Sequence, residues 1–186
     1  MKKTFFYCLI LSHLSACFQT RNVEPPDSLG SDWVSPTNYE QLLQNFKKAV
    51  QNGNEQNYIR CLSSANYHFS PTAAAYNGNE SVWQNWLTEN EKVYLLNIRS
   101  AVASIGNGLE MSVVDVQTSS PDSVKYIADY TLTLPFKDST VCKVYKGQMI
   151  LTLKLNASNE WEMQRWTDVE THRDSAWSNL KLRFKQ

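Results

Sequence analysis

The chain has 186 residues, of which 42% are hydrophobic and 12% aromatic, so its length and composition are those of one folded domain with short appendages. Basic and acidic side chains number 18 each. Removal of the first sixteen residues takes Lys2 and Lys3 with it and leaves 16 basic against 18 acidic side chains, a net charge of −2. The surplus of positive charge that neutralises a phosphate backbone is missing, so we expect no nucleic-acid partner.

Residues 1–16 have the pattern of a secretory signal peptide. Lys2 and Lys3 form a positive n-region, and an apolar segment from Phe5 to Leu14 follows. That segment is shorter than the roughly 20 apolar residues of a membrane-spanning helix, and we expect no transmembrane segment elsewhere. Leu14-Ser15-Ala16-Cys17 resembles the bacterial lipobox, in which the cysteine receives a diacylglyceryl group before cleavage. We therefore predict a lipoprotein signal peptide; an ordinary secretory signal that happens to contain Cys17 is the alternative.

Cys17 is the predicted lipid attachment site, through which the protein would be anchored in a lipid bilayer. Each buried acyl CH₂ contributes about 0.8 kcal/mol, so several chains on one cysteine give a durable anchor. Lipoproteins of the inner membrane resemble one another in having Asp after the cysteine, where this chain has Phe18. The resemblance to lipoprotein signals implies a location in the cell envelope. In a Gram-negative cell, the absence of Asp after the cysteine implies the periplasmic face of the outer membrane. Residues 17–36 contain Pro25-Pro26, Gly30, Pro36 and four serines and threonines, and they are predicted to form an extended tether. Trp33 of this tether either docks on the domain or stays exposed.

Helices are expected in the first half of the domain. Thr37 and Glu40 match a capping box, an apolar face follows, and Gly53 ends that helix. A short helix around 58–62 and a brief strand at 67–69 come next. Residues 80–99 again have helical periodicity, with a break at Thr88, where Thr88 and Glu91 form a second T-x-x-E pair.

From Leu109 onward the apolar pattern has a period of two. It predicts four strands, which cover Leu109–Thr118, Ser123–Phe136, Val141–Leu155 and Trp161–Asp168. Residues 175–184 have apolar side chains at helical spacing, which predicts an added C-terminal helix. Helices first and an antiparallel meander afterwards indicate a single α+β domain over residues 37–186.

This order of elements resembles the superfamily of nuclear transport factor two, ketosteroid isomerase and polyketide cyclases. The resemblance rests on the Leu42–Phe46 helix, the Tyr58–Leu62 helix, the Trp83–Trp86 segment and the strands that end at Asp168. It implies N-terminal helices packed in a curved antiparallel sheet, a cone-shaped roll. A cystatin-like or unrelated α+β roll is the alternative.

Enzymes of that superfamily use an Asp, Tyr or His of the pocket as a general acid or base. The residues that could line such a pocket here are Tyr126, Asp129, Tyr130, Trp161 and Asp168. A carboxylate inside an apolar cone would have a raised pKa. Strict alternation, however, places Asp129 on the opposite face from Tyr126 and Tyr130. His68 and His172 are interpreted as surface residues.

The sequence contains no metal-ligand spacing, no phosphate-binding glycine loop and no G-x-S-x-G, so no cofactor, metal or catalytic residue is predicted. Cys61 and Cys142 either form a disulfide or remain free thiols. We expect a membrane-anchored lipoprotein that binds an apolar ligand or an envelope protein without catalysis. The alternative is a small isomerase, dehydratase or hydrolase that uses an Asp/Tyr pair or a His in the cone.

Trp161 and Trp166 are five residues apart in the last predicted strand, which places them on opposite faces under strict alternation. One would then pack in the cone and the other against the C-terminal helix; otherwise a bulge brings both inside. We expect the first arrangement, because the added helix needs an apolar surface on an outer face that is otherwise polar.

Overall fold

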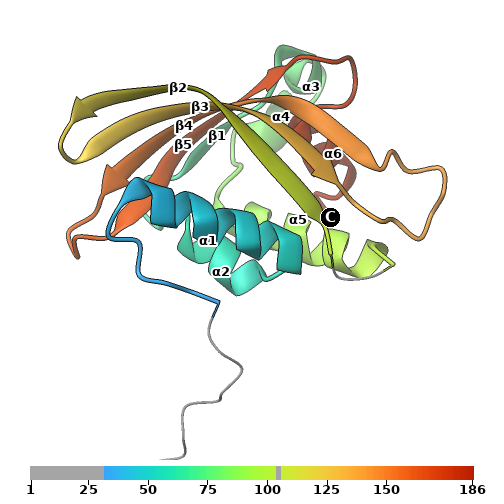
Figure 1. Ribbon diagram of the computed structural model, residues 1–186. Helices are drawn as coiled ribbons and strands as arrows, with labels where there is room; N and C mark the ends of the chain where they lie inside the picture. The colour runs from blue at the N-terminus through green and yellow to red at the C-terminus, as the bar shows by residue number, and fades with distance from the viewer. Residues whose placement is uncertain (1–31, 104–105) are drawn as a thin grey trace, which may run out of the picture. The chain divides into compact units, whose positions relative to one another are not determined.

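The computed structural model describes residues 32–103 and 106–186. The predicted signal peptide, Cys17 and the tether up to residue 31 lie outside these residues. Six helices are described: α1 (Tyr39–Asn52), α2 (Glu55–Arg60), α3 (Ala73–Tyr76), α4 (Glu80–Trp83), α5 (Thr88–Ala101) and α6 (Trp177–Arg183). The five described strands are β1 (His68–Ser70), β2 (Gly108–Ser120), β3 (Ser123–Thr133), β4 (Val144–Leu155) and β5 (Trp161–Glu170). The sheet arches over α1, α2 and α5 (Figure 1), which confirms the predicted α+β cone.

Helix α1 begins one residue later than the capping box predicts. The side chain of Asn38 accepts a hydrogen bond from the backbone N–H of Gln41 at 2.7 Å, so Asn38, not Thr37, is the N-cap. The apolar face is buried as expected, with Leu42 and Phe46 fully inaccessible. Gly53 ends the helix with a positive φ of 59°, and its N–H bonds the carbonyls of Ala49 and Val50.

The predicted break at Thr88 is confirmed, because α4 and α5 are separate helices. The second predicted capping box is wrong. Asn90 accepts the hydrogen bond from the backbone N–H of Leu87 at 2.9 Å, whereas Glu91 is completely buried. One position along a helix turns a side chain by about 100°, which is enough to separate a capping position from a core position.

The sheet has the order β1-β5-β4-β3-β2. Strands β2 to β5 form the antiparallel meander that the sequence predicts. Strand β1 differs, since it runs parallel to β5 with Phe69 opposite Trp166. Several helices separate β1 from the meander in the chain, so no hairpin forces the antiparallel direction, and the sheet is mixed.

A β-bulge in β5 decides where the added helix packs. Met163 lies opposite Leu153 and Arg165 opposite Thr152, so Gln164 is an extra residue in β5. The side-chain parity therefore changes between Trp161 and Trp166, and both are buried on the concave face, at 8% and 0% exposure. The expected arrangement on opposite faces is wrong. Helix α6 packs inside the curve of the sheet, against Trp166.

Residues 32–36, which the composition assigns to the tether, lie against the domain. The backbone N–H of Trp161 donates to the carbonyl of Pro36 at 2.8 Å, and the Asn45 amide donates to the carbonyl of Val34 at 2.6 Å. The Arg60 guanidinium lies 4.1 Å from the ring centre of Trp33, which therefore docks.

Two further expectations concern the cysteines and the membrane. Cys61 is buried and Cys142 exposed, and both are free thiols. Burial raises the pKa of the Cys61 thiol. Within residues 32–103 and 106–186, no helix combines the length and apolar character needed to cross a bilayer.

Candidate functional site

The structure brings two of the five candidate pocket residues into contact. The hydroxyl of Tyr130 on β3 donates to Asp168 on β5 at 2.8 Å, and both side chains are buried on the concave face. Tyr126 lies on the same face of β3 as Tyr130 and is also buried. Trp161 contacts Tyr39 of α1, with ring centroids 5.9 Å apart.

Asp129 faces the opposite side of the sheet. Its side chain is exposed and accepts a hydrogen bond from Gln148 at 3.0 Å on the convex face. Alternation along β3 separates it from Tyr130, and β3 has no bulge against β4 that would change this parity. An acid–base pair of Asp129 with either neighbouring tyrosine is therefore impossible in this structure.

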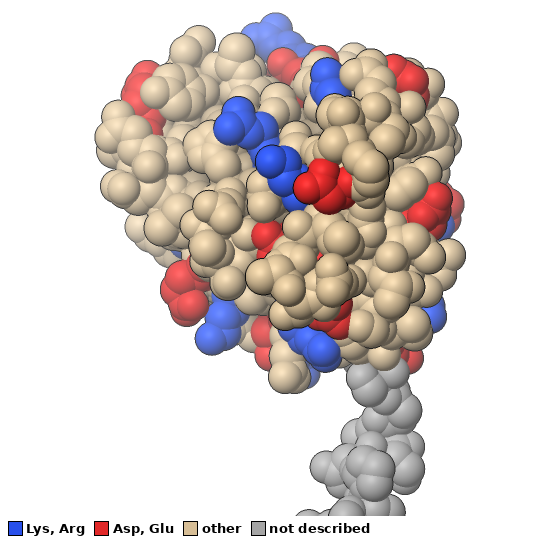
Figure 2. Space-filling model, turned by 90° about the vertical axis from the view of Figure 1, so that its left-hand side faces the viewer, with Lys and Arg blue, Asp and Glu red and all other residues tan. Residues whose placement is uncertain are grey.

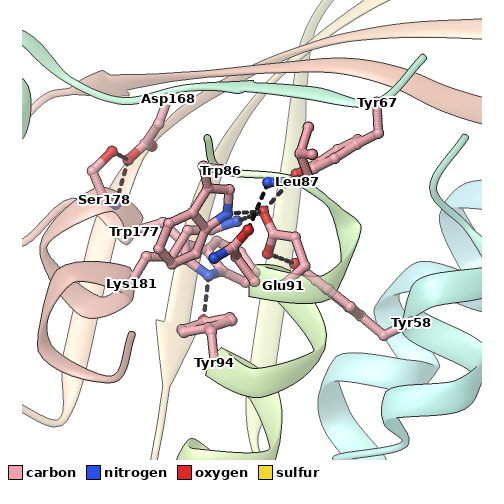
Figure 3. A network of polar contacts seen from close by, with 11 residues as sticks. Tyr58, Tyr67, Trp86, Leu87, Glu91, Tyr94, Asp168, Trp177, Ser178 and Lys181 are labelled. Carbon is pink, nitrogen blue, oxygen red and sulfur yellow. Dashed lines mark hydrogen bonds and ion pairs between the residues drawn. The ribbon is translucent and has the colours of Figure 1, made fainter. Parts of the chain in front are cut away.

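The polar centre of the domain is an ion pair between Glu91 of α5 and Lys181 of α6 (Figure 3). Both side chains have 0% exposure. The Glu91 carboxylate also accepts hydrogen bonds from the hydroxyls of Tyr58 at 2.9 Å and Tyr67 at 2.7 Å, and from the indole of Trp86 at 2.8 Å. Four donors thus surround one carboxylate, which compensates for its removal from water.

The ammonium group of Lys181 lies among aromatic rings. Its Nζ is 3.8 Å from the ring centre of Phe69 and 4.3 Å from that of Trp166, with Tyr94 and Trp86 at 5.4 and 5.7 Å. These are cation–π distances, and they strengthen in a dry interior. Burial lowers the pKa of Lys181 to about 8, against the opposing effect of the Glu91 charge.

Asp168 is the second buried carboxylate and is also bound by α6. It accepts hydrogen bonds from the backbone N–H of Ser178 at 2.7 Å and from the Ser178 hydroxyl. Burial raises the pKa of Asp168, while the hydrogen bonds from Ser178 and Tyr130 act in the opposite direction. Both acidic groups of the concave side therefore have partners within the chain.

Trp177 completes the contacts of α6. Its indole N–H donates to the hydroxyl of Tyr94 at 2.6 Å, and its backbone N–H donates to the hydroxyl of Tyr130 at 2.6 Å. Phe46, Tyr130 and Trp166 pack around its ring. In the described part of the chain, no cluster of three His, Cys, Asp or Glu residues could hold a metal ion.

The sequence did not indicate Glu91 or Lys181 as site residues. Glu91 stands where a capping glutamate would stand, and Lys181 lies among the basic residues of Leu180–Lys185. A signal existed in the apolar spacing, because Trp177, Leu180 and Lys181 fall on one face of a helix. A lysine on that face, however, is usually a solvated residue at its edge.

The outer part of β2 has a different character. Strand β2 is the last strand of the sheet, and residues 112–119 are exposed on both faces. Val113, Val114 and Val116 there are 60%, 54% and 37% exposed. Figure 2 shows the side of the domain at which β2 and β3 turn, where acidic and basic side chains are scattered among uncharged areas. This segment is an exposed sheet edge on which three valines stand beside polar side chains and the charged Asp115.

No protein-family model matches the chain, and the search of curated proteins found no match. Solved structures share its fold. A protein of Novosphingobium aromaticivorans assigned provisionally as a scytalone dehydratase is 11% identical, with a TM-score of 0.57 over 74% of this chain and 88% of that one. A provisionally assigned aromatic ring hydroxylase of the same organism is 10% identical, with a TM-score of 0.55 over 72% and 87%.

A ketosteroid isomerase-like protein of Erwinia carotovora atroseptica is 12% identical, with a TM-score of 0.50 over 70% of this chain and 93% of that one. At these identities the likeness shows the fold alone. It confirms the cone-shaped α+β architecture that the order of elements predicts.

Proposed function

We propose that the chain is a lipid-anchored lipoprotein of the bacterial cell envelope whose domain binds a protein partner at its surface and performs no catalysis. One observation carries the second half of this proposal. The acidic groups on the concave side, Glu91 and Asp168, are 0% and 2% exposed and are bound by donors of the domain itself. A general acid or base must approach its substrate to about 2.6–3.2 Å, and here α6 occupies that position.

The pocket-enzyme alternative requires a space beside these groups. The rings of Trp166 and Trp177 and the side chain of Lys181 fill the concave side at the place where Asp168 and Tyr130 meet. With α6 docked, Asp168 has no room for a substrate. The names of the enzymes with a similar fold therefore do not favour catalysis by this chain.

A protein partner is favoured by the exposed edge of β2. Extended segments bind such edges by adding a strand, in which main-chain hydrogen bonds give affinity and alternate side chains give specificity. The exposed residues 112–119 offer this main chain, and Val113, Val114 and Val116 offer apolar contacts. The occupant that fits is an extended, predominantly apolar segment of an envelope protein.

The anchor is tested by metabolic labelling with a fatty acid in cells that express the full chain. We expect label on the wild type and on Cys142→Ala, which removes an exposed thiol of the domain. Cys17→Ala should carry no label and should remain uncleaved or unanchored. Label on Cys17→Ala would contradict the lipoprotein assignment.

The binding surface is tested by cross-linking in cells, followed by mass spectrometry of the captured proteins. Val114→Lys places a charge on the exposed edge, and we expect it to abolish the specific cross-links. Glu91→Gln changes the interior and should keep them if the protein folds. The opposite pattern, in which the interior variant alone loses the cross-links, would place function in the cone and contradict this proposal.

A further inference from the structure

Helix α6 supplies partners to four polar side chains of the interior: Glu91, Tyr94, Tyr130 and Asp168. Lys181 binds Glu91, Ser178 binds Asp168, and Trp177 binds the hydroxyls of Tyr94 and Tyr130. These contacts come from one helix of seven residues. Figure 3 shows their side chains directed from α6 toward the interior. The helix therefore occupies the interior in the way that a bound ligand would.

The surroundings of Lys181 have the composition of an ammonium-binding site. Four aromatic rings lie within 6 Å of its Nζ, and the Glu91 carboxylate neutralises the charge. Aromatic rings around a cation are the arrangement that proteins use to recognise ammonium ligands. Tyr58, Tyr67 and Trp86 hold the carboxylate in place without any contribution from α6.

Helix α6 follows β5 through residues 171–176, of which 171–174 are exposed. Ala176 is fully buried, and the carbonyl of Ser175 accepts a hydrogen bond from the backbone N–H of Lys146 in β4 at 2.7 Å, so release of α6 would break this one backbone contact with the sheet. A helix of seven residues does not persist alone in water, so its docking and its folding are one event.

We propose that the interior of the domain is a binding site for a primary alkylammonium group, that the chain fills this site with its own Lys181, and that α6 is its removable plug. The ligand that replaces it carries a primary ammonium at the end of an unbranched carbon chain. A polyamine and a lysine side chain share this chemistry. The inference goes beyond the proposed surface function and does not depend on it.

The site is tested with Lys181→Ala in the full chain and n-butylammonium chloride as the probe. We expect a saturable rise of the melting temperature with n-butylammonium and a much smaller one with 1-butanol, which has the same carbon chain without the charge. Lys181→Met fills the space and should show neither. If Lys181→Ala does not fold alone, the recovery of folded protein on refolding with each compound is the readout. An equal response to 1-butanol, or no saturable response, would overturn the ammonium site.

The two sources of the ligand are distinguished with the same variant. Spermidine and an N-acetyl-lysine amide are titrated in place of n-butylammonium. The compound that reaches half of its maximal rise in melting temperature at the lower concentration, which is its saturation point, identifies the source. A saturation point above that of n-butylammonium for both would overturn the claim that a ligand of this class replaces α6.

The plug is tested by native-state hydrogen exchange on the unmodified chain. We expect the amides of Leu180 and Phe184, which are hydrogen-bonded within and at the end of α6, to exchange at least ten times faster than the amides at the centre of β4. Exchange of all these amides at one common rate would mean that α6 opens only with global unfolding, and it would overturn the plug. Neither result affects the lipid-labelling or cross-linking experiments.

Discussion

The rings of Trp166 and Trp177 meet edge to face, with centroids 4.7 Å apart and an interplanar angle of 83°. This contact joins β5, the last strand in the chain, to the C-terminal helix α6. Aromatic pairs in this geometry contribute about 0.5–1.5 kcal/mol beyond the burial of their surface. It exists because the bulge at Gln164 turns Trp166 toward the concave side.

Replacement of either tryptophan of β5 should destabilise the domain, but only one should loosen α6. Trp166→Ala removes a fully buried ring and should cost about 3–5 kcal/mol of unfolding free energy. Trp161→Ala removes a ring that contacts Tyr39 instead. Hydrogen exchange of residues 177–183 should accelerate in Trp166→Ala and remain at the wild-type rate in Trp161→Ala. Equal acceleration in both variants would be inconsistent with the packing described.

The stability of the domain should depend on pH through Lys181. Its pKa of about 8 in the folded state lies below the value of 10.5 for an exposed lysine. Between these values the unfolded chain binds more protons, so this group makes the unfolding free energy rise with pH. Burial raises the pKa values of Tyr58 and Cys61, and these groups act in the opposite direction at alkaline pH.

The difference between wild type and Lys181→Met isolates the lysine, because the other groups are common to both chains. Urea unfolding at pH 7, 8, 9 and 9.5 should show the wild type gaining stability relative to the variant above pH 8. A difference that is constant or falls over this range would show that the pKa of Lys181 is not lowered in the folded state.

Asp168 and Asp129 provide a matched pair of carboxylates on opposite faces of the sheet. Asp168→Ala leaves buried donors of Ser178 and Tyr130 without a partner, each at a cost of about 1–3 kcal/mol. Asp129→Ala removes an exposed side chain and should change the unfolding free energy by less than about 0.5 kcal/mol. Chemical denaturation measures both, and a similar loss in the two variants would argue against the assigned faces.

Asn45 should determine whether residues 32–36 stay on the domain. Its buried amide bonds the backbone of Val34 on both the N–H and the carbonyl side. Asn45→Ala should lower the unfolding free energy by about 1–3 kcal/mol and open residues 32–36 to proteolysis. Gln44→Ala, at an exposed position on the same helix, is the control and should leave the cleavage pattern unchanged. Protection of residues 32–36 in Asn45→Ala would refute this role.

Most elements of the fold could be predicted from the sequence because their apolar residues repeat with a regular period. The helix around Leu42–Phe46 and the strands of the meander illustrate this. The parallel strand β1 was not predicted as such, because the direction of pairing depends on β5, about a hundred residues away. The packing of α6 was missed for a related reason. A single extra residue, Gln164, reverses the parity of β5, and no local pattern marks it.

The candidate site was predicted in part. Alternation correctly separated Asp129 from Tyr130, and Asp168 lies beside that tyrosine. Glu91 and Lys181 could not be paired from the sequence, because they are ninety positions apart and each stands where charged residues are commonly solvated. Their burial depends on the helices that carry them.

The closure of the interior by Lys181 and Glu91 is tested most directly by a double-mutant cycle of Lys181→Met, Glu91→Gln and the double variant, measured by urea unfolding at pH 7. Removal of the lysine alone leaves a buried carboxylate without its counter-charge and should cost about 3–5 kcal/mol. The double variant removes both charges and should be more stable than the sum of the single losses, with a coupling energy of about 1–3 kcal/mol. A coupling energy within about 0.5 kcal/mol of zero would mean that the two residues do not form a buried pair, and it would contradict the closed interior.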